Sequence, residues 1–85
     1  MLTLDFAGTT ADRRRVGATS ITLVQLHNDL WRVTRPAGEV VGYVEKFMSP
    51  DGTRYRAKRL LVAERRFVPI GEFWAFDEAV DCFAW

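Results

Sequence analysis

Cysteine and histidine are nearly absent from this chain of 85 residues, which contains one of each, Cys82 and His27. A single cysteine allows no disulfide within the chain, and a structural zinc site needs more Cys and His ligands than these. We therefore expect no bound metal. A chain without disulfides is typical of the reducing cytoplasm.

Long apolar runs are also missing. The longest uncharged stretch, VGATSITLVQLHN from Val16, is interrupted by Thr, Ser, Gln, His and Asn, whereas a membrane-spanning helix needs about 20 mostly apolar residues. The start of the chain lacks the basic segment and apolar run that mark a secretory signal. These absences predict a cytoplasmic protein with no membrane segment.

The residue types that usually perform catalysis are scarce. Serine occurs only at Ser20 and Ser49, neither of which lies in a G-x-S-x-G motif. His27 has no cysteine near it in the sequence, and no glycine-rich loop could hold a phosphate. The sequence therefore predicts a protein that is not an enzyme and has no cofactor.

Apolar and aromatic residues are plentiful, at 48% and 13% of the chain, which is more than a disordered chain contains. Residues 7–20, AGTTADRRRVGATS, differ because they combine Gly, Thr, Ser and charge with no apolar period, so they are interpreted as a linker. We expect a flexible N-terminal segment over 1–19 and a single small α+β domain over 20–85. In LTLDF, residues 2–6, apolar and polar residues alternate, so this segment could add a further strand.

Alternating apolar and polar residues between positions 20 and 73 predict strands, with turn signals at Pro36–Gly38 and Asp51-Gly52. After Phe73 the apolar period changes to three and four residues, which predicts a short amphipathic helix from Phe76. The predicted fold is α+β: an antiparallel meander of three to four strands with one C-terminal helix packed on one face. The predicted core consists of Trp31, Val33, Val41, Tyr43, Tyr55, Ala57, Leu61, Phe73, Val80 and Phe83.

Charge is unevenly distributed along a chain whose total is only +1. Residues 31–66 contain nine basic and four acidic residues, whereas residues 67–85 contain four acidic and no basic ones. In RYRAKRLL, alternation places Arg54, Arg56 and Lys58 on one outward row. We expect this row to form the centre of a nucleic-acid-binding surface, with Arg32 and Lys46 on the neighbouring strands.

Three segments resemble sheet-type DNA-binding domains. GEFWAFDEAVDCF, residues 71–83, is similar to the last strand-to-helix junction of the plant ethylene-response-factor type domain, and WRVTR is similar to that family's first strand. YVEKFMSPDGTRYRAKRL resembles the hairpin of the amino-terminal arm-binding domains of phage-type integrases. The resemblance covers about residues 30 to 84. The matching positions of the junction are Gly71, Phe73, Glu78, Ala79 and Phe83.

This resemblance implies a three-stranded sheet, backed by one helix, that enters the major groove of DNA. The chain departs from the pattern at Ala75, where the family has a capping Thr or Ser, and at the additional segment LVAERRFVPI. The strand arginines do not align one by one, so no DNA contact is transferred. The general pattern also resembles small bacterial proteins without an assigned function.

Two alternatives to nucleic-acid binding remain open. In the first, the domain is a protein-interaction module in which exposed aromatics such as Trp74 and Trp85 make the contact. In the second, it is a structural module whose Arg and Lys side chains only solvate one face of the sheet. Binding through phosphates weakens steeply with salt, and a hydrophobic protein interface does not. Salt dependence therefore separates the alternatives.

Overall fold

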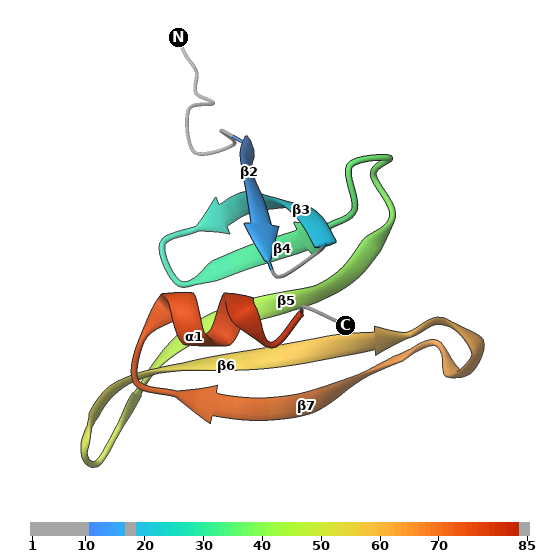
Figure 1. Ribbon diagram of the computed structural model, residues 1–85. Coiled ribbons are helices and arrows are strands. Elements are labelled where there is room, and N and C mark those ends of the chain that lie inside the picture. Colours follow the sequence, from blue (N-terminus) through green and yellow to red (C-terminus); the bar gives the residue numbers. More distant parts are fainter. Residues whose placement is uncertain (1–10, 17–18, 84–85) are drawn as a thin grey trace, which may run out of the picture.

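The computed structural model describes the backbone of residues 11–16 and 19–83 and the side chains of residues 20–83. It contains a six-stranded antiparallel sheet in which neighbouring strands follow chain order (Figure 1). A 3₁₀ turn, η1 (Val62–Glu64), joins the last two strands, and a helix, α1 (Phe76–Asp81), follows them. The strands are β2 (Ala11–Val16), β3 (Thr19–His27), β4 (Leu30–Thr34), β5 (Val40–Ser49), β6 (Gly52–Leu61) and β7 (Arg66–Phe73). The antiparallel sheet with one C-terminal helix is confirmed, but three to four strands is too few.

Strand β2 lies in the segment that the sequence suggests is a linker. It pairs with β3, with Ala11 opposite Val24 and Val16 opposite Thr19. The linker interpretation is therefore wrong for residues 11–16, because backbone pairing to a neighbouring strand needs no apolar period. The possible strand LTLDF lies outside the described residues, and the flexibility of residues 1–19 stays a prediction.

Glycines with positive φ close both predicted hairpins. Gly38, at φ +101°, donates its N–H to the carbonyl of Arg35 at 2.8 Å between β4 and β5. Gly52, at φ +125°, stands opposite Ser49 where β5 turns into β6. A residue with a Cβ rarely adopts these angles, so the glycines fix where the strands end.

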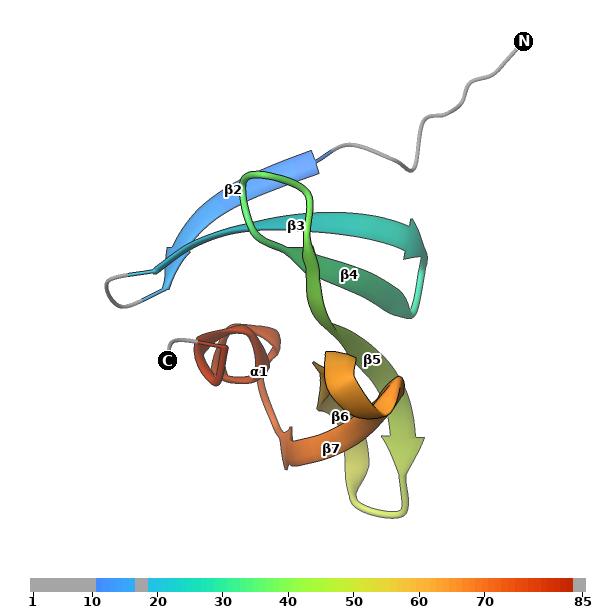
Figure 2. The same cartoon turned by 90° about the vertical axis from the view of Figure 1, so that its right-hand side faces the viewer.

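Three irregularities in strand register bend the sheet. They fall between Gln25 and His27, between Val33 and Thr34, and in β7 at Ile70, the residue after Pro69. Such bulges kink a strand and increase its twist. In Figure 2 the bent sheet places β2–β4 above α1 and β6–β7 below it, so the helix occupies the concave side.

One hydrophobic core joins the concave side of the sheet to the helix. Its buried members are Ile21, Leu23, Val33, Val44, Ala57, Ala79, Val80 and Phe83, with half-buried Trp31, Val41, Tyr55 and Phe73 packed against them. The prediction is wrong for Tyr43 and Leu61, which lie outside this cluster. Strand β5 instead turns Gly42 and Val44 inward, because the missing side chain of Gly42 leaves room for the Phe83 ring: a Cβ there would lie 2.5 Å from Cε1 of Phe83.

The helix is held by packing more than by capping. Ala75 at its N-cap offers no side-chain acceptor, although its own N–H donates to Oε1 of Glu78 at 3.2 Å. The ring of Phe76 lies 4.7 Å from that of Trp31 and 5.8 Å from that of Tyr55. Helix α1 is too short to be stable alone, so these aromatic contacts with β4 and β6 fix its position.

Candidate functional site

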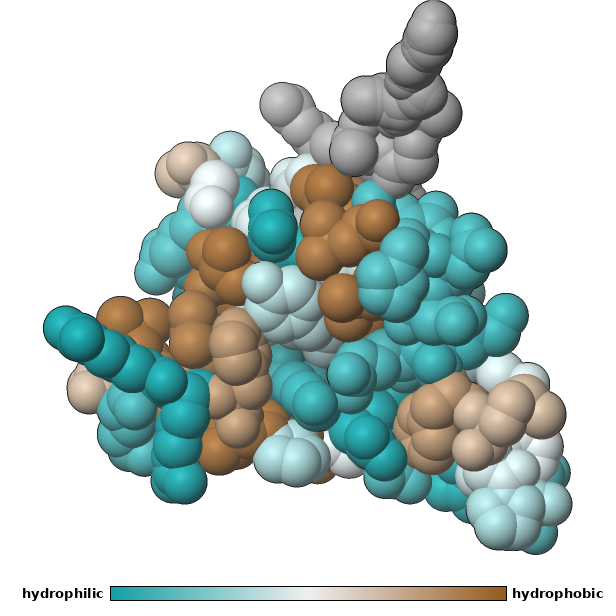
Figure 3. All heavy atoms as spheres, turned by 180° about the vertical axis from the view of Figure 1, so that it is seen from behind, coloured by the Kyte–Doolittle hydropathy of each residue, from teal (hydrophilic) through white to brown (hydrophobic). Residues whose placement is uncertain are grey.

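The predicted cationic row lies on the side of the sheet that faces away from α1, which we call the convex face. Because Ala57 is buried against the helix side, its neighbours Arg56 and Lys58 point the other way. Figure 3 shows this face, where hydrophobic surface is interrupted by hydrophilic surface. Strand register places on it Arg32, Tyr43 and Lys58 in one row, Leu30, Glu45, Arg56 and Glu72 in the next, and Phe47 and Arg54 in a third.

Two carboxylates tie the cationic row together. Glu72 Oε2 accepts from Nη2 of Arg56 at 3.0 Å and from its Nε at 3.2 Å, while Oε1 lies 3.9 Å from Nη1 of Arg54. Glu45 Oε1 lies 3.0 Å from Nζ of Lys58 and 3.7 Å from Nη1 of Arg56. That oxygen lacks the angles of a hydrogen bond, so we regard these as electrostatic contacts. We call Arg54, Arg56, Lys58, Glu45 and Glu72 the ion-pair network; its net charge is +1.

Aromatic rings cover the same guanidinium groups. The Cζ atom of Arg54 lies 4.0 Å from the ring centre of Trp74, and that of Arg56 lies 4.3 Å from the ring centre of Phe47. Each guanidinium therefore has both a ring and a carboxylate as partners. The three basic side chains remain about one-third exposed or less, so an external anion would have to compete with these contacts.

Arg32 and Lys46, the other two predicted site residues, are placed differently. Arg32 lies on the convex face opposite Tyr43, and its Nε is buried without a hydrogen-bond partner among the described residues. Lys46 stands opposite Tyr55, whose ring packs against the core side. Alternation thus places Arg32 on the same face as Arg54, Arg56 and Lys58 and turns Lys46 to the other face, although Lys46 also borders a hollow that Arg56 lines.

An apolar hollow of about 310 Å³ lies beside the ion-pair network. Its walls are Leu26, Leu30, Tyr43 and Phe67, and the Lys58–Glu45 pair forms its rim. The rings of Tyr43 and Phe67 meet edge to face at 4.9 Å. Leu26 and Phe67 are 36% and 42% exposed, so two apolar side chains that line the same hollow are both open to solvent.

A second hollow, of about 230 Å³, adjoins the first and shares Leu30 and Glu45 with it. His27 and Asp29 from the β3–β4 turn and Lys46, Phe47 and Arg56 from the sheet also line it. In that turn, Nδ1 of His27 accepts from the N–H of Asp29 at 3.2 Å. The histidine therefore has a structural role in the turn.

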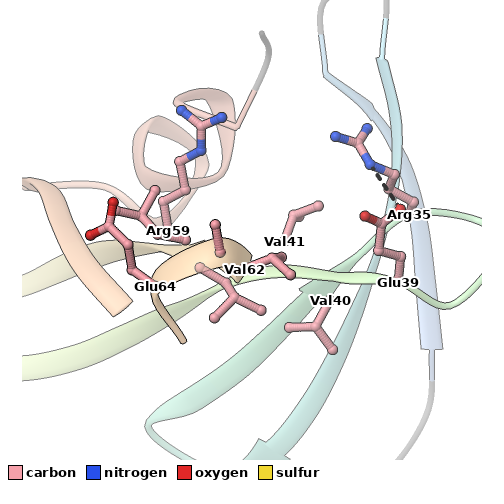
Figure 4. Close-up of a pocket in the computed structure, with 10 residues that line it drawn as sticks. Arg35, Glu39, Val40, Val41, Arg59, Val62 and Glu64 are labelled. Atoms are coloured by element: carbon pink, nitrogen blue, oxygen red, sulfur yellow. Dashed lines mark ion pairs between the residues drawn. The ribbon is translucent and has the colours of Figure 1, made fainter. Parts of the chain in front are cut away.

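A third hollow, of about 300 Å³, opens at the end of the sheet between the β4–β5 turn and η1. Figure 4 shows Arg35 and Glu39 on one side, 3.5 Å apart, Arg59 and Glu64 on the other, and valines between them. Both signs of charge are equally represented at its rim. Its lining contains no Ser, Cys or His, so it offers no nucleophile.

The remaining chemistry of the described chain is limited. Burial raises the pKa of the Cys82 thiol from 9.0 to about 11, and its Sγ donates to the carbonyl of Ala79 at 3.0 Å. Within residues 20–83, no group of three or more His, Cys, Asp or Glu side chains is arranged to hold a metal ion. None of the described helices is long and apolar enough to cross a membrane.

Comparisons of the chain with models of protein families, with curated proteins and with solved structures find no match. The resemblance to sheet-type DNA-binding domains therefore stays a prediction.

Sequence analysis missed the two acidic members of the network and the hollow beside it. The position of Glu45 could have been predicted from strand register, because a two-residue turn that sets Ser49 opposite Gly52 also sets Glu45 opposite Arg56. Glu72 was not, because the bulge at Ile70 shifts the register of β7 by one residue. No sequence signal indicated that Tyr43 and Phe67, from strands that are not neighbours, make one wall.

Proposed function

We propose that this protein is a non-enzymatic binding domain that binds a protein partner through the convex face. The observation that carries this proposal is the exposed apolar hollow between Leu26, Leu30, Tyr43 and Phe67, beside a cationic row that is already paired with Glu45 and Glu72. Apolar side chains in a concave site, with a few polar groups at the rim, are the usual composition of a recognition surface.

Nucleic-acid binding through the same face is the second candidate. The observation that favours it is the stacking of Arg54 on Trp74 and of Arg56 on Phe47, since cations and rings together form surfaces for single strands. Against it stand the carboxylates of the network, which reduce a row of three positive charges to a net charge of +1 and would repel phosphates.

Site-specific photocrosslinking tests the first candidate. A benzophenone side chain at position 67, in the wall of the hollow, should give a discrete adduct in lysate of the source cells, and the adduct should be destroyed by protease but not by nuclease. The same group at position 62 is the matched control, because Val62 is also exposed but lines the hollow at the end of the sheet. Leu26→Glu should abolish the adduct at 67. An adduct that nuclease destroys, or equal adducts from both positions, would overturn the proposal.

Salt dependence tests the second candidate. Each phosphate contact contributes roughly −0.9 to the slope of log affinity against log salt. The network and Arg32 together carry a net charge of +2, so we expect a slope no steeper than about two contacts produce. A clearly steeper slope with mixed duplex or single-stranded DNA would favour nucleic acid over protein. Replacing Arg54, Arg56 and Lys58 together is a poor probe, because it leaves Glu45 and Glu72 without partners.

A further inference from the structure

The partner chemistry of the convex face follows from the contrast between Arg32 and the other basic residues on it. Arg54, Arg56 and Lys58 each have a carboxylate within 4 Å. Within the part of the chain that the structure describes, no acidic side chain pairs with Arg32, whose Nε, like that of Arg54, is a buried donor without an acceptor. Because Arg32 is half-buried and its guanidinium charge has no carboxylate beside it among these residues, this position favours a carboxylate supplied from outside.

Arg32 also lies next to the apolar hollow. It stands opposite Tyr43 on the adjacent strand and two residues along β4 from Leu30, and both of those residues line the hollow. Adjacent strands are about 4.8 Å apart, and same-face residues within a strand are about 6.6–6.8 Å apart. An apolar side chain in the hollow and a carboxylate at Arg32 therefore belong to residues that are close together in the ligand.

The charge balance of the described register rows on this face points the same way. These rows contain Arg32, Arg54, Arg56 and Lys58 against Glu45 and Glu72, which leaves them cationic by two charges. The hollow, at about 310 Å³, lies at the lower end of the range of about 300–1,000 Å³ for small-molecule sites. It has room for one bulky side chain and not for a large ligand.

We infer that the convex face binds an extended acidic segment of a partner protein, with one aromatic or leucine side chain in the hollow and a carboxylate two residues away at Arg32. This inference rests on the proposed function and specifies its ligand. The apolar side chain supplies buried area, and the charge pair sets the position of the segment along β4 and β5.

Amide chemical shifts of the ¹⁵N-labelled full chain test the inference with synthetic peptides. The probe is acetyl-Ser-Glu-Ser-Phe-Ser-Glu-Ser-amide, which carries an acid on both sides of the ring and so fits either chain direction. Two control peptides replace both Glu by Gln, or Phe by Ala. We expect the probe to shift the amides of Leu26, Leu30, Tyr43 and Phe67, and the Gln peptide to bind about tenfold more weakly, as expected for one charge-assisted hydrogen bond.

Two protein variants complete the test. Arg32→Gln should lower the affinity for the probe peptide about tenfold. Arg35→Gln, the same change in the hollow at the end of the sheet, should leave the affinity for the probe unchanged. Equal affinity of the Glu and Gln peptides, or shifts confined to other residues, would overturn the inference, as would the absence of shifts. If an oligothymidylate of eight nucleotides shifts the same amides and binds more tightly than the probe peptide, the face belongs to nucleic acid. If the peptides fail while crosslinking at position 67 succeeds, the partner is a protein of different chemistry, and only the inference fails.

Discussion

Gly42→Ala should destabilise the fold strongly, although it adds a single methyl group. An added Cβ would lie 2.5 Å from Cε1 and 2.9 Å from Cζ of the Phe83 ring, and closer still to the carbonyl oxygen of Lys58. Overpacking a core costs about 1–3 kcal/mol. Here one obstacle is backbone, which cannot rotate away, so we expect a cost of about 3 kcal/mol. A chain of this length has a total stability of roughly 4–13 kcal/mol.

Urea unfolding followed by tryptophan fluorescence measures this cost, and a second background separates its two causes. Leucine at position 83 lacks the ring atoms that meet the new methyl group but leaves the Lys58 carbonyl in place. Gly42→Ala should therefore cost less in the Phe83→Leu protein, with a coupling of about 0.5–2 kcal/mol. An equal cost in both backgrounds would exclude the ring as a cause. A cost below about 0.5 kcal/mol in the native background would refute the close approach itself.

Three further predictions concern other parts of the molecule. Glu72→Gln should lower the free energy of unfolding by less than about 1 kcal/mol, and by still less at high salt, because its pairs with Arg54 and Arg56 are partly exposed; urea titrations at two salt concentrations measure this. Cys82 should react with a thiol reagent at pH 8 about 100-fold more slowly in the folded than in the unfolded chain, since its pKa is about 11 instead of 9.0. The raised pKa favours the neutral thiol in the folded state, so the linked contribution to stability is present below pH 9 and is lost as the pH rises towards 11. A chain lacking residues 1–19 should still fold, because the buried cluster begins at Ile21, but the amides of β3 that pair with β2 should exchange faster; a chain that fails to fold would make the N-terminal segment integral to the domain.

Local sequence patterns sufficed to predict antiparallel strands between Ile21 and Phe73, although not their number, and to predict both glycine turns and the start of α1. They failed where the deciding contact is distant in sequence. Both faces of β5 look apolar, one through Tyr43 and Phe47 and the other through Gly42 and Val44. The second is buried because it meets Phe83, which lies about forty residues further along the chain and whose position depends on the whole sheet.

The same distinction between local and distant contacts applies to the candidate site. Alternation within β6 correctly placed Arg54, Arg56 and Lys58 on one outward row, because that placement depends on one strand alone. Their neutralisation depends on three strands, since Glu45 reaches the row from β5 and Glu72 from β7. A row of positive charge in a sequence therefore indicates a phosphate-binding surface only when the neighbouring strands bring no acids to it.

Strand β7 bears on how this chain behaves at high concentration. Among the described strands it lies at one end of the sheet, and Phe67 and Ile70 on it are 42% and 40% exposed. A straight strand of this kind, with its free N–H and C=O groups in a regular row, would be a template for fibril growth. Pro69 has no N–H to offer, and the bulge at Ile70 breaks the regular spacing of the groups on either side of it. We therefore expect this edge to be a poor template for amyloid-like growth, despite its exposed apolar side chains.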